Sequence, residues 1–163
     1  GKPLKDTVDR DEPVREYALF GMHGCHVNIT DGQYVYMRAC DGGSGENNDN
    51  LKNYTLMPAH MKNSFDLEEL RAAEFVDGFS FTKGLKLLAV PGTQKIASMG
   101  FPPTTLFDGG HMLFDVTRDP GQLHPLDDPQ TEARMVKHMV RLMRENDAPV
   151  EQYVRLGLTA ECS

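Results

Sequence analysis

Cysteine, positive charge and long apolar runs are all scarce in this sequence of 163 residues. Its three cysteines, Cys25, Cys40 and Cys162, are too few and too unevenly spaced for a framework of disulfides, so we expect three thiols. The 24 acidic residues outnumber the 17 basic ones, which leaves no basic surplus to neutralise a nucleic acid or an anionic membrane. No apolar run approaches the roughly 20 residues of a membrane-spanning helix.

The motifs of several enzyme classes are also missing. There is no Gly-x-Ser-x-Gly elbow of a serine hydrolase and no Gly-rich loop ending in Gly-Lys-Ser/Thr for a nucleotide. His23-Gly24-Cys25-His26 is the densest group of metal-ligand residues, but no second Cys/His cluster completes the three or four ligands that zinc needs. The residues alone therefore favour a binding or interaction module over an enzyme.

Alternating β-rich segments dominate the first two thirds of the chain. Asp31-Gly32 separates the runs 26–30 and 33–38, which predicts a β-hairpin because both turn positions favour positive φ. The other strands that we expect lie at residues 16–20, 53–57, 85–90 and 112–116, with an extended segment at 79–81.

Helix signals appear in the middle and at the end. Asp66 followed by Glu69 predicts a capping box for a short helix at residues 66–73. Asp128 and Pro129 predict the start of a long C-terminal helix. The apolar residues that share one face of this helix are Val136, Met139, Val140 and Met143. The sequence thus predicts an α+β fold, in which an antiparallel sheet of about four strands packs against the long C-terminal helix.

Several stretches together resemble the C-terminal region of bacterial sulfatases. The first comprises residues 16–21 and 27–38, and the second comprises residues 54–61 and 79–84. The ending is the most telling, and it consists of Leu113-Phe114-Asp115-Val116, Asp119-Pro120-Gly121-Gln122, residues 125–129 and the helix 131–146. The resemblance runs from about Pro3 to the end, and it implies a four-stranded antiparallel sheet and a C-terminal helix that pack on a catalytic domain.

The resemblance also implies that the chemistry lies outside this chain. Such sulfatases carry a Cys-x-Pro-x-Arg motif, whose cysteine becomes formylglycine, and acidic ligands for a calcium ion. No cysteine here begins that motif, so no catalytic residue and no metal ligand carries over. Because the chain begins with Gly1, we expect residues 1–15 to be a linker from a missing catalytic domain and residues 16–163 to be the sulfatase C-terminal domain.

In related enzymes this domain helps to shape the rim of the substrate pocket. The resemblance therefore makes His23, His60 and Lys83 candidates for a rim that contacts a sulfated small molecule or sugar. Lysine suits a sulfate group because it presents a compact positive charge. The alternatives are structural, namely a histidine that packs in a turn and a lysine that is simply solvated.

Two other functions stay open. The chain fits a stand-alone, non-catalytic binding module, and it equally fits the same domain of a phosphate or phosphonate monoester hydrolase, because the nucleophile that would distinguish these enzymes is absent. A domain that docks on a larger partner is expected to expose an apolar patch, through which the fragment would also self-associate. The candidates for this patch are Tyr17, Leu19, Phe79, Phe81 and Leu113.

Overall fold

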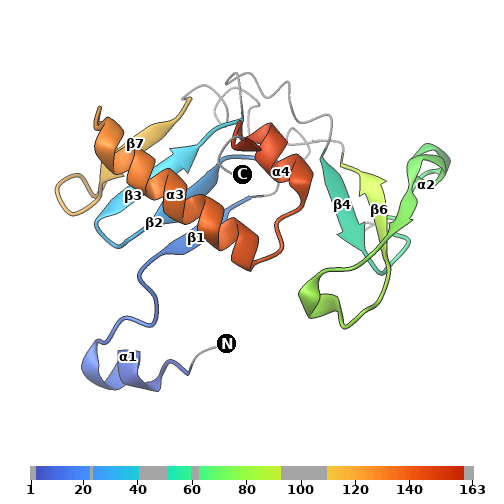
Figure 1. Cartoon of the computed structure of the whole chain (residues 1–163), viewed down its shortest axis with the longest axis horizontal. Coiled ribbons are helices and arrows are strands. Elements are labelled where there is room, and N and C mark those ends of the chain that lie inside the picture. Colours follow the sequence, from blue (N-terminus) through green and yellow to red (C-terminus); the bar gives the residue numbers. More distant parts are fainter. Residues whose placement is uncertain (1–2, 23, 41–50, 60–62, 93–109, 160–163) are drawn as a thin grey trace.

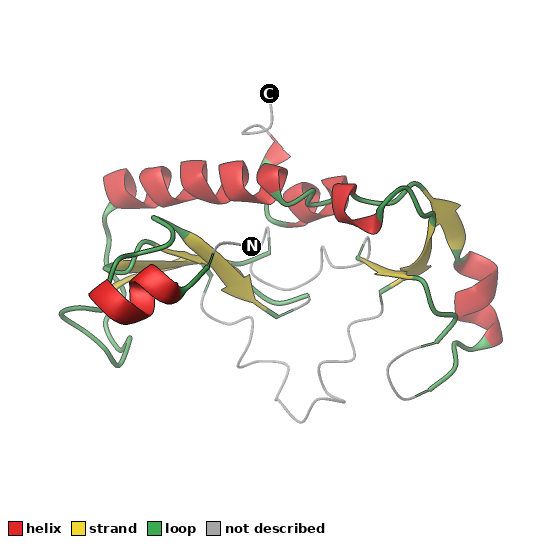
Figure 2. Cartoon of the chain, turned by 90° about the horizontal axis from the view of Figure 1, so that it is seen from below, coloured by secondary structure: helices red, strands yellow, loops and turns green. Residues whose placement is uncertain are grey.

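The computed structural model describes residues 3–22, 24–40, 51–59, 63–92 and 110–159 of the chain (Figure 1, Figure 2). Its helices are α1 (Lys5–Arg10), α2 (Leu67–Ala72), the 3-10 helix η2 (Ser80–Thr82), α3 (Pro129–Glu145) and α4 (Val150–Arg155). Its strands are β1 (Ala18–Gly21), β2 (Val27–Thr30), β3 (Tyr34–Arg38), β4 (Lys52–Thr55), β5 (Glu74–Val76), β6 (Leu87–Pro91) and β7 (Met112–Asp115).

The strands form two antiparallel sheets. The larger sheet has four strands in the order β1-β2-β3-β7, and the smaller has three in the order β4-β6-β5. The long helix α3 lies along one face of the larger sheet, whereas the smaller sheet stands to one side with α2 (Figure 1, Figure 2). The predicted α+β fold, with about four antiparallel strands against a long C-terminal helix, is therefore confirmed.

The predicted hairpin is the pair β2 and β3. The Asp31 carboxylate accepts hydrogen bonds from the backbone N–H groups of Gln33 and Tyr34, at 3.0 and 2.7 Å, and so closes the turn. Gly32 takes a φ of 93°, which a residue with a Cβ rarely adopts. The local sequence therefore fixes both the turn and the register of this hairpin.

Helix α3 begins where the sequence predicts. The Asp128 carboxylate caps it by accepting from the N–H groups of Gln130 and Thr131, at 3.2 and 3.1 Å. The buried residues of the helix are Met135, Met139, Val140 and Met143. They pack into one core with Ile29, Tyr36, Leu113, Tyr153, Leu156 and Leu158. Removing one such buried side chain typically costs about 2–5 kcal/mol, so this contact anchors the helix on the sheet.

The register of the larger sheet separates its two faces. One cross-strand row faces α3 and consists of Leu19, Ile29, Tyr36 and Leu113. The next row points to the opposite face, because successive side chains of a strand alternate. That row consists of Phe20, Asn28, Met37 and Met112. The sheet therefore has one face covered by α3 and a second face that α3 does not reach.

Among the described residues, two hydrogen bonds join the smaller sheet and the connection η2 to the C-terminal helical segment. Asp147, between α3 and α4, accepts from the backbone N–H of Ser80 at 2.8 Å. The hydroxyl of Tyr54 in β4 donates to the carboxylate of Glu151 in α4. Burial and the charge of Glu151 raise the pKa of Tyr54, so this hydroxyl stays a donor. The connection between sheets is thus polar rather than a shared strand.

Of residues 79–81, which the sequence predicts to be extended, Phe79 is extended, whereas Ser80 and Phe81 belong to η2. Thr82 donates both its backbone N–H and its hydroxyl to the carbonyl of Phe79, at 2.9 and 2.8 Å. The rings of Phe79 and Phe81 stack with centroids 5.4 Å apart. Local bonds from a threonine side chain therefore outcompete the extended conformation here.

The expected apolar patch needs correction. Leu113 is only 3% exposed and belongs to the core, and Tyr17 and Leu19 pack against that core. Phe81 alone of the five candidates is strongly exposed, at 69%. The patch is misplaced because the strand register turns Leu19 and Leu113 towards α3. Self-association of the chain stays a prediction.

Residues 1–15, read as a linker, contain α1. No residue of α1 is buried, and the helix stands away from the sheets in Figure 1. An ion pair between Asp6 and Arg10, one helical turn apart, supports it. The division into a linker and a domain at residue 16 stays a prediction. Within the described ranges, no helix is long and apolar enough to cross a membrane.

Candidate functional site

Of the three predicted rim residues, the structure describes only Lys83. His23 and His60 lie outside the described residues. Lys83 is exposed, has a left-handed φ of 56° and ends η2 beside the smaller sheet. It is therefore accessible to a ligand, and its relation to the two histidines stays a prediction.

The described neighbours of His23 border a pocket of about 550 Å³ on the sheet face that α3 does not cover. The residues that line it are Phe20, Gly21, Met22, Cys25, His26, Asn28, Met37 and Met112. Nε2 of His26 lies 3.0 Å from the carbonyl oxygen of Gly110, which holds this ring in a structural contact. The pocket is largely apolar, and it suits an apolar side chain of another molecule better than a charged substrate.

One polar group interrupts this apolar wall. Oδ1 of Asn28 is buried and has no hydrogen-bond partner among the described residues. A buried carbonyl oxygen without a donor is costly, so it favours an occupant that brings an N–H or O–H group. The sequence shows Asn28 on a strand, but only the cross-strand row places it between Phe20 and Met37.

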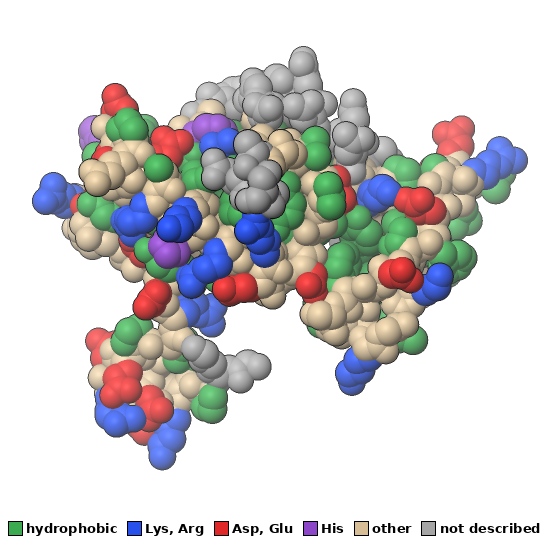
Figure 3. All heavy atoms as spheres, in the orientation of Figure 1, with side chains coloured by type: hydrophobic (Ala, Val, Ile, Leu, Met, Phe, Trp, Pro, Cys, Tyr) green, Lys and Arg blue, Asp and Glu red, His purple; other side chains and the backbone are tan. Residues whose placement is uncertain are grey.

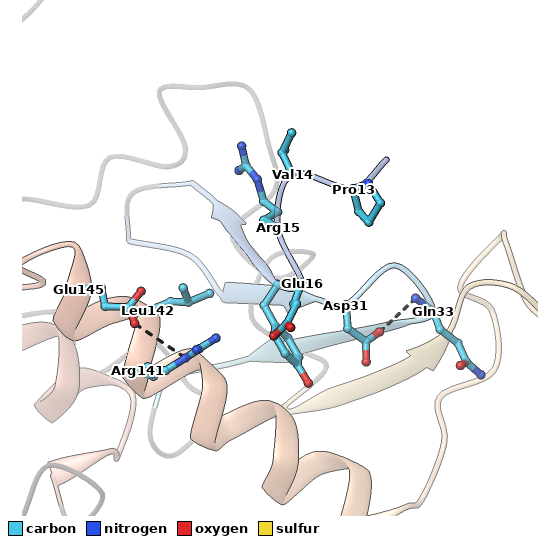
Figure 4. A pocket seen from close by; sticks show the side chains of 10 residues that line it. Pro13, Val14, Arg15, Glu16, Asp31, Gln33, Arg141, Leu142 and Glu145 are labelled. Atoms are coloured by element: carbon cyan, nitrogen blue, oxygen red, sulfur yellow. Dashed lines mark hydrogen bonds and ion pairs between the residues drawn. The ribbon is translucent and has the colours of Figure 1, made fainter. Parts of the chain in front are cut away.

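A second pocket of about 950 Å³ lies between the segment before β1, the hairpin turn and the end of α3 (Figure 4). Its lining residues are Pro13, Val14, Arg15, Glu16, Tyr17, Asp31, Gln33, Arg141, Leu142 and Glu145. Charges of both signs line it, and one pair, Arg141 and Glu145, lies 3.9 Å apart (Figure 4). Basic and acidic side chains are therefore mixed along the wall of this pocket.

Next to this pocket, Tyr17 and His138 tie the chain before β1 to α3. Their rings stack with centroids 3.9 Å apart. Arg134 donates to the Tyr17 hydroxyl at 3.0 Å and to the Asp31 carboxylate at 2.8 Å. Nδ1 of His138 is buried without a hydrogen-bond partner among the described residues. The stack therefore encloses a histidine that cannot readily take up a proton.

Positive charge surrounds this histidine. Figure 3 shows lysine and arginine side chains gathered over α3, and helical spacing places Arg134, Lys137 and Arg141 on its outer side. Burial first, and then the charges of Arg141, Arg134 and Lys137, lower the pKa of His138, while Glu16 acts in the opposite direction. His138 is therefore neutral in the folded chain at neutral pH.

A third pocket, of about 440 Å³, is bordered by Asp115, Asp119, Asp127 and Asp128. The hydrogen bonds from Thr117 and Gln33 lower the pKa of Asp115 to about 2, against the effect of burial. The Asp119 carboxylate accepts from the backbone of Leu123 and His124, and Asp128 caps α3. These carboxylates thus serve the fold, and the described residues contain no group of three ligands suited to a metal ion.

The chain matches no protein-family model, no curated protein sequence and no solved structure. The functional proposal therefore rests on the sequence motifs and on the architecture of the larger sheet.

We predict that His138 titrates below its ordinary pKa of 6.5. The unfolded chain takes up this proton more readily than the folded chain, so the free energy of unfolding should fall as the pH drops through that value. Arg141→Gln should raise the midpoint of His138 in an NMR titration, because it removes a nearby positive charge. Lys86→Gln, on the smaller sheet, is the control, and equal midpoints for both variants would contradict the prediction.

Proposed function

We propose that this chain is the C-terminal accessory domain of a sulfatase, packing on the catalytic domain and helping to shape the rim of the substrate pocket. The ordered motifs between residues 16 and 146 support this proposal. The observation that carries it is the four-stranded antiparallel sheet with α3 on one face, which is the architecture that the resemblance implies.

The face of the larger sheet opposite α3, which none of the described helices covers, is the part that we assign to docking. Phe20 and Met22 are 46% and 40% exposed at the mouth of the apolar pocket, and Met37 and Met112 line its wall. Contiguous exposed apolar surface of this kind marks contact sites between proteins or domains. The unpartnered oxygen of Asn28 adds a single polar anchor for a donor on the catalytic domain.

In this proposal, the described residues take no part in bond breaking. Formylglycine and calcium belong to the catalytic domain, and the acidic residues described here do not fit a calcium site, because the carboxylates of Asp115, Asp119 and Asp128 already accept hydrogen bonds. In this proposal the chain helps to bind a sulfated small molecule or sugar through Lys83, His23 and His60.

The proposal predicts where sulfatase activity resides. We expect hydrolysis of an aryl sulfate by a protein that includes the catalytic domain encoded upstream, and none by residues 1–163 alone. An aryl phosphate is assayed in parallel. Turnover by the isolated chain would contradict an accessory role, and preferential turnover of the phosphate ester would point to a phosphate monoester hydrolase. An upstream sequence that encodes no hydrolase would favour a stand-alone binding module.

Docking through the uncovered sheet face predicts a specific loss of affinity. Phe20→Asp should weaken binding of this chain to the separately produced catalytic domain by at least about tenfold, because it places a charge in an apolar contact. Val150→Asp, at an apolar residue on α4 that is 75% exposed against 46% for Phe20, is the control. Calorimetric titration measures both. If Phe20→Asp binds as tightly as Val150→Asp while both remain folded, docking lies elsewhere.

The rim assignment makes a separate prediction for Lys83. In the complete enzyme, Lys83→Ala should raise KM for the sulfated substrate by about tenfold, because a hydrogen bond to a charged group is lost. Lys86→Ala, an exposed lysine that lies 3.8 Å from Asp77, controls for loss of charge in this region. Similar KM values for the two variants would remove Lys83 from the rim.

A further inference from the structure

Two cysteines meet at the open end of the β2–β3 hairpin. Cys25 precedes β2 and Cys40 follows β3, so both lie just beyond the pair Val27–Arg38 that ends the ladder of the hairpin. Cys25 and Cys40 are both thiols, 6% and 2% exposed. Free cysteine is often buried as a small apolar side chain, so burial alone assigns these two thiols no role.

The side chain of Arg155 in α4 confirms that the two cysteines are neighbours. Its Nη1 donates to the carbonyl oxygen of Cys25 at 2.9 Å and to Sγ of Cys40 at 3.1 Å. The same guanidinium donates to Oε1 of Gln152 at 2.9 and 3.1 Å. Arg155 is only 2% exposed, and none of these partners is a carboxylate.

A buried positive charge that faces sulfur is unusual for a purely structural arginine. Removing a charge from water is expensive, and it is normally offset by an opposite charge. Positive charge beside a cysteine is instead typical of cysteines that react. Burial raises the pKa of the Cys25 thiol, the charge of Arg155 opposes this rise, and Cys40 adds to it, so the two thiols also interact electrostatically.

Among the described residues, Cys25 faces the pocket on the sheet face opposite α3. Cys25 forms part of the wall of the 550 Å³ pocket, whereas Cys40 is covered more completely. A small reagent in the pocket therefore meets Cys25 first. Nη1 of Arg155 contacts both the Cys25 carbonyl oxygen and Sγ of Cys40, so the two residues lie close together, as a disulfide requires.

We propose that Cys25 and Cys40 are a redox pair that forms a reversible disulfide across the open end of the hairpin. The oxidant is a small-molecule disulfide such as oxidised glutathione. The Cys25 thiolate attacks one of its sulfurs, which breaks the S–S bond, forms a mixed disulfide and releases one small thiol. The Cys40 thiolate then attacks Sγ of Cys25, and the second small thiol leaves. Two electrons pass to the oxidant, and the two cysteine protons end on the released thiols.

The bond would change how α4 is held. In the reduced chain, Arg155 donates to Sγ of Cys40, and this contact fastens α4 to the hairpin. A disulfide holds Sγ of Cys40 within bonding distance of Sγ of Cys25, so oxidation changes that contact while it cross-links the two ends of the hairpin. The pair therefore couples the redox state to the way α4 is held, and because Cys25 lines the pocket assigned to docking, the test uses the chain without a catalytic domain.

The test is equilibration of the folded full-length chain with reduced and oxidised glutathione, followed by alkylation and mass spectrometry. We expect two thiols to be lost together, with a cross-link between the tryptic peptides 16–38 and 39–52. Cys162→Ser should keep this cross-link, whereas Cys25→Ser and Cys40→Ser should each abolish it. Dithiothreitol should restore both thiols.

Three results would overturn the proposal. They are glutathione attached to separate cysteines without a cross-link, a cross-link to Cys162, and thiols that are oxidised only after urea unfolds the chain. The readout is covalent, so it does not depend on activity of a catalytic domain.

Discussion

Met135, Met139 and Met143 of α3 rest on the row of sheet residues that includes Ile29 and Tyr36, and the other long-range contacts follow from this packing. Because α3 is fixed on the sheet, the residues that follow it in the chain have defined positions. Asp147 reaches the smaller sheet, and Arg155 reaches the hairpin. Without the apolar contact, neither polar link would have its partner within reach.

The parts of the fold that the sequence predicts are those with local causes. The Asp31-Gly32 turn, the capping box of Asp66 and Glu69, and the cap of α3 at Asp128 each act within a few residues of the chain. Each of these hydrogen bonds joins residues that lie two or three apart in the chain, so the local sequence pattern is enough to predict the turn and the two helix caps. The α+β class followed because the helix and the strands carry these signals clearly.

The remaining features depend on partners far apart in the chain. No local pattern says that β4 pairs with β6 rather than with β3, or that Leu113 faces α3. The residues of the candidate site likewise divide into those placed by local sequence and those placed by partners far apart in the chain. Cys25 and Cys40 flank the β2–β3 hairpin, which the sequence does predict, whereas the approach of Arg155 depends on the whole helical segment. Lys83 is exposed in the structure, whereas the rim role of His23 and His60 rests on the resemblance alone.

The strand order β1-β2-β3-β7 has a consequence for the chain as it emerges from the ribosome. β2 and β3 can pair as soon as residue 38 is made, but the second edge of β3 waits for Met112–Asp115. At about 5–20 residues per second, this edge stays unpaired for on the order of several seconds. An open edge is prone to pairing with other chains. The unpaired edge of β3 is therefore the part of the nascent protein that most needs protection by a chaperone.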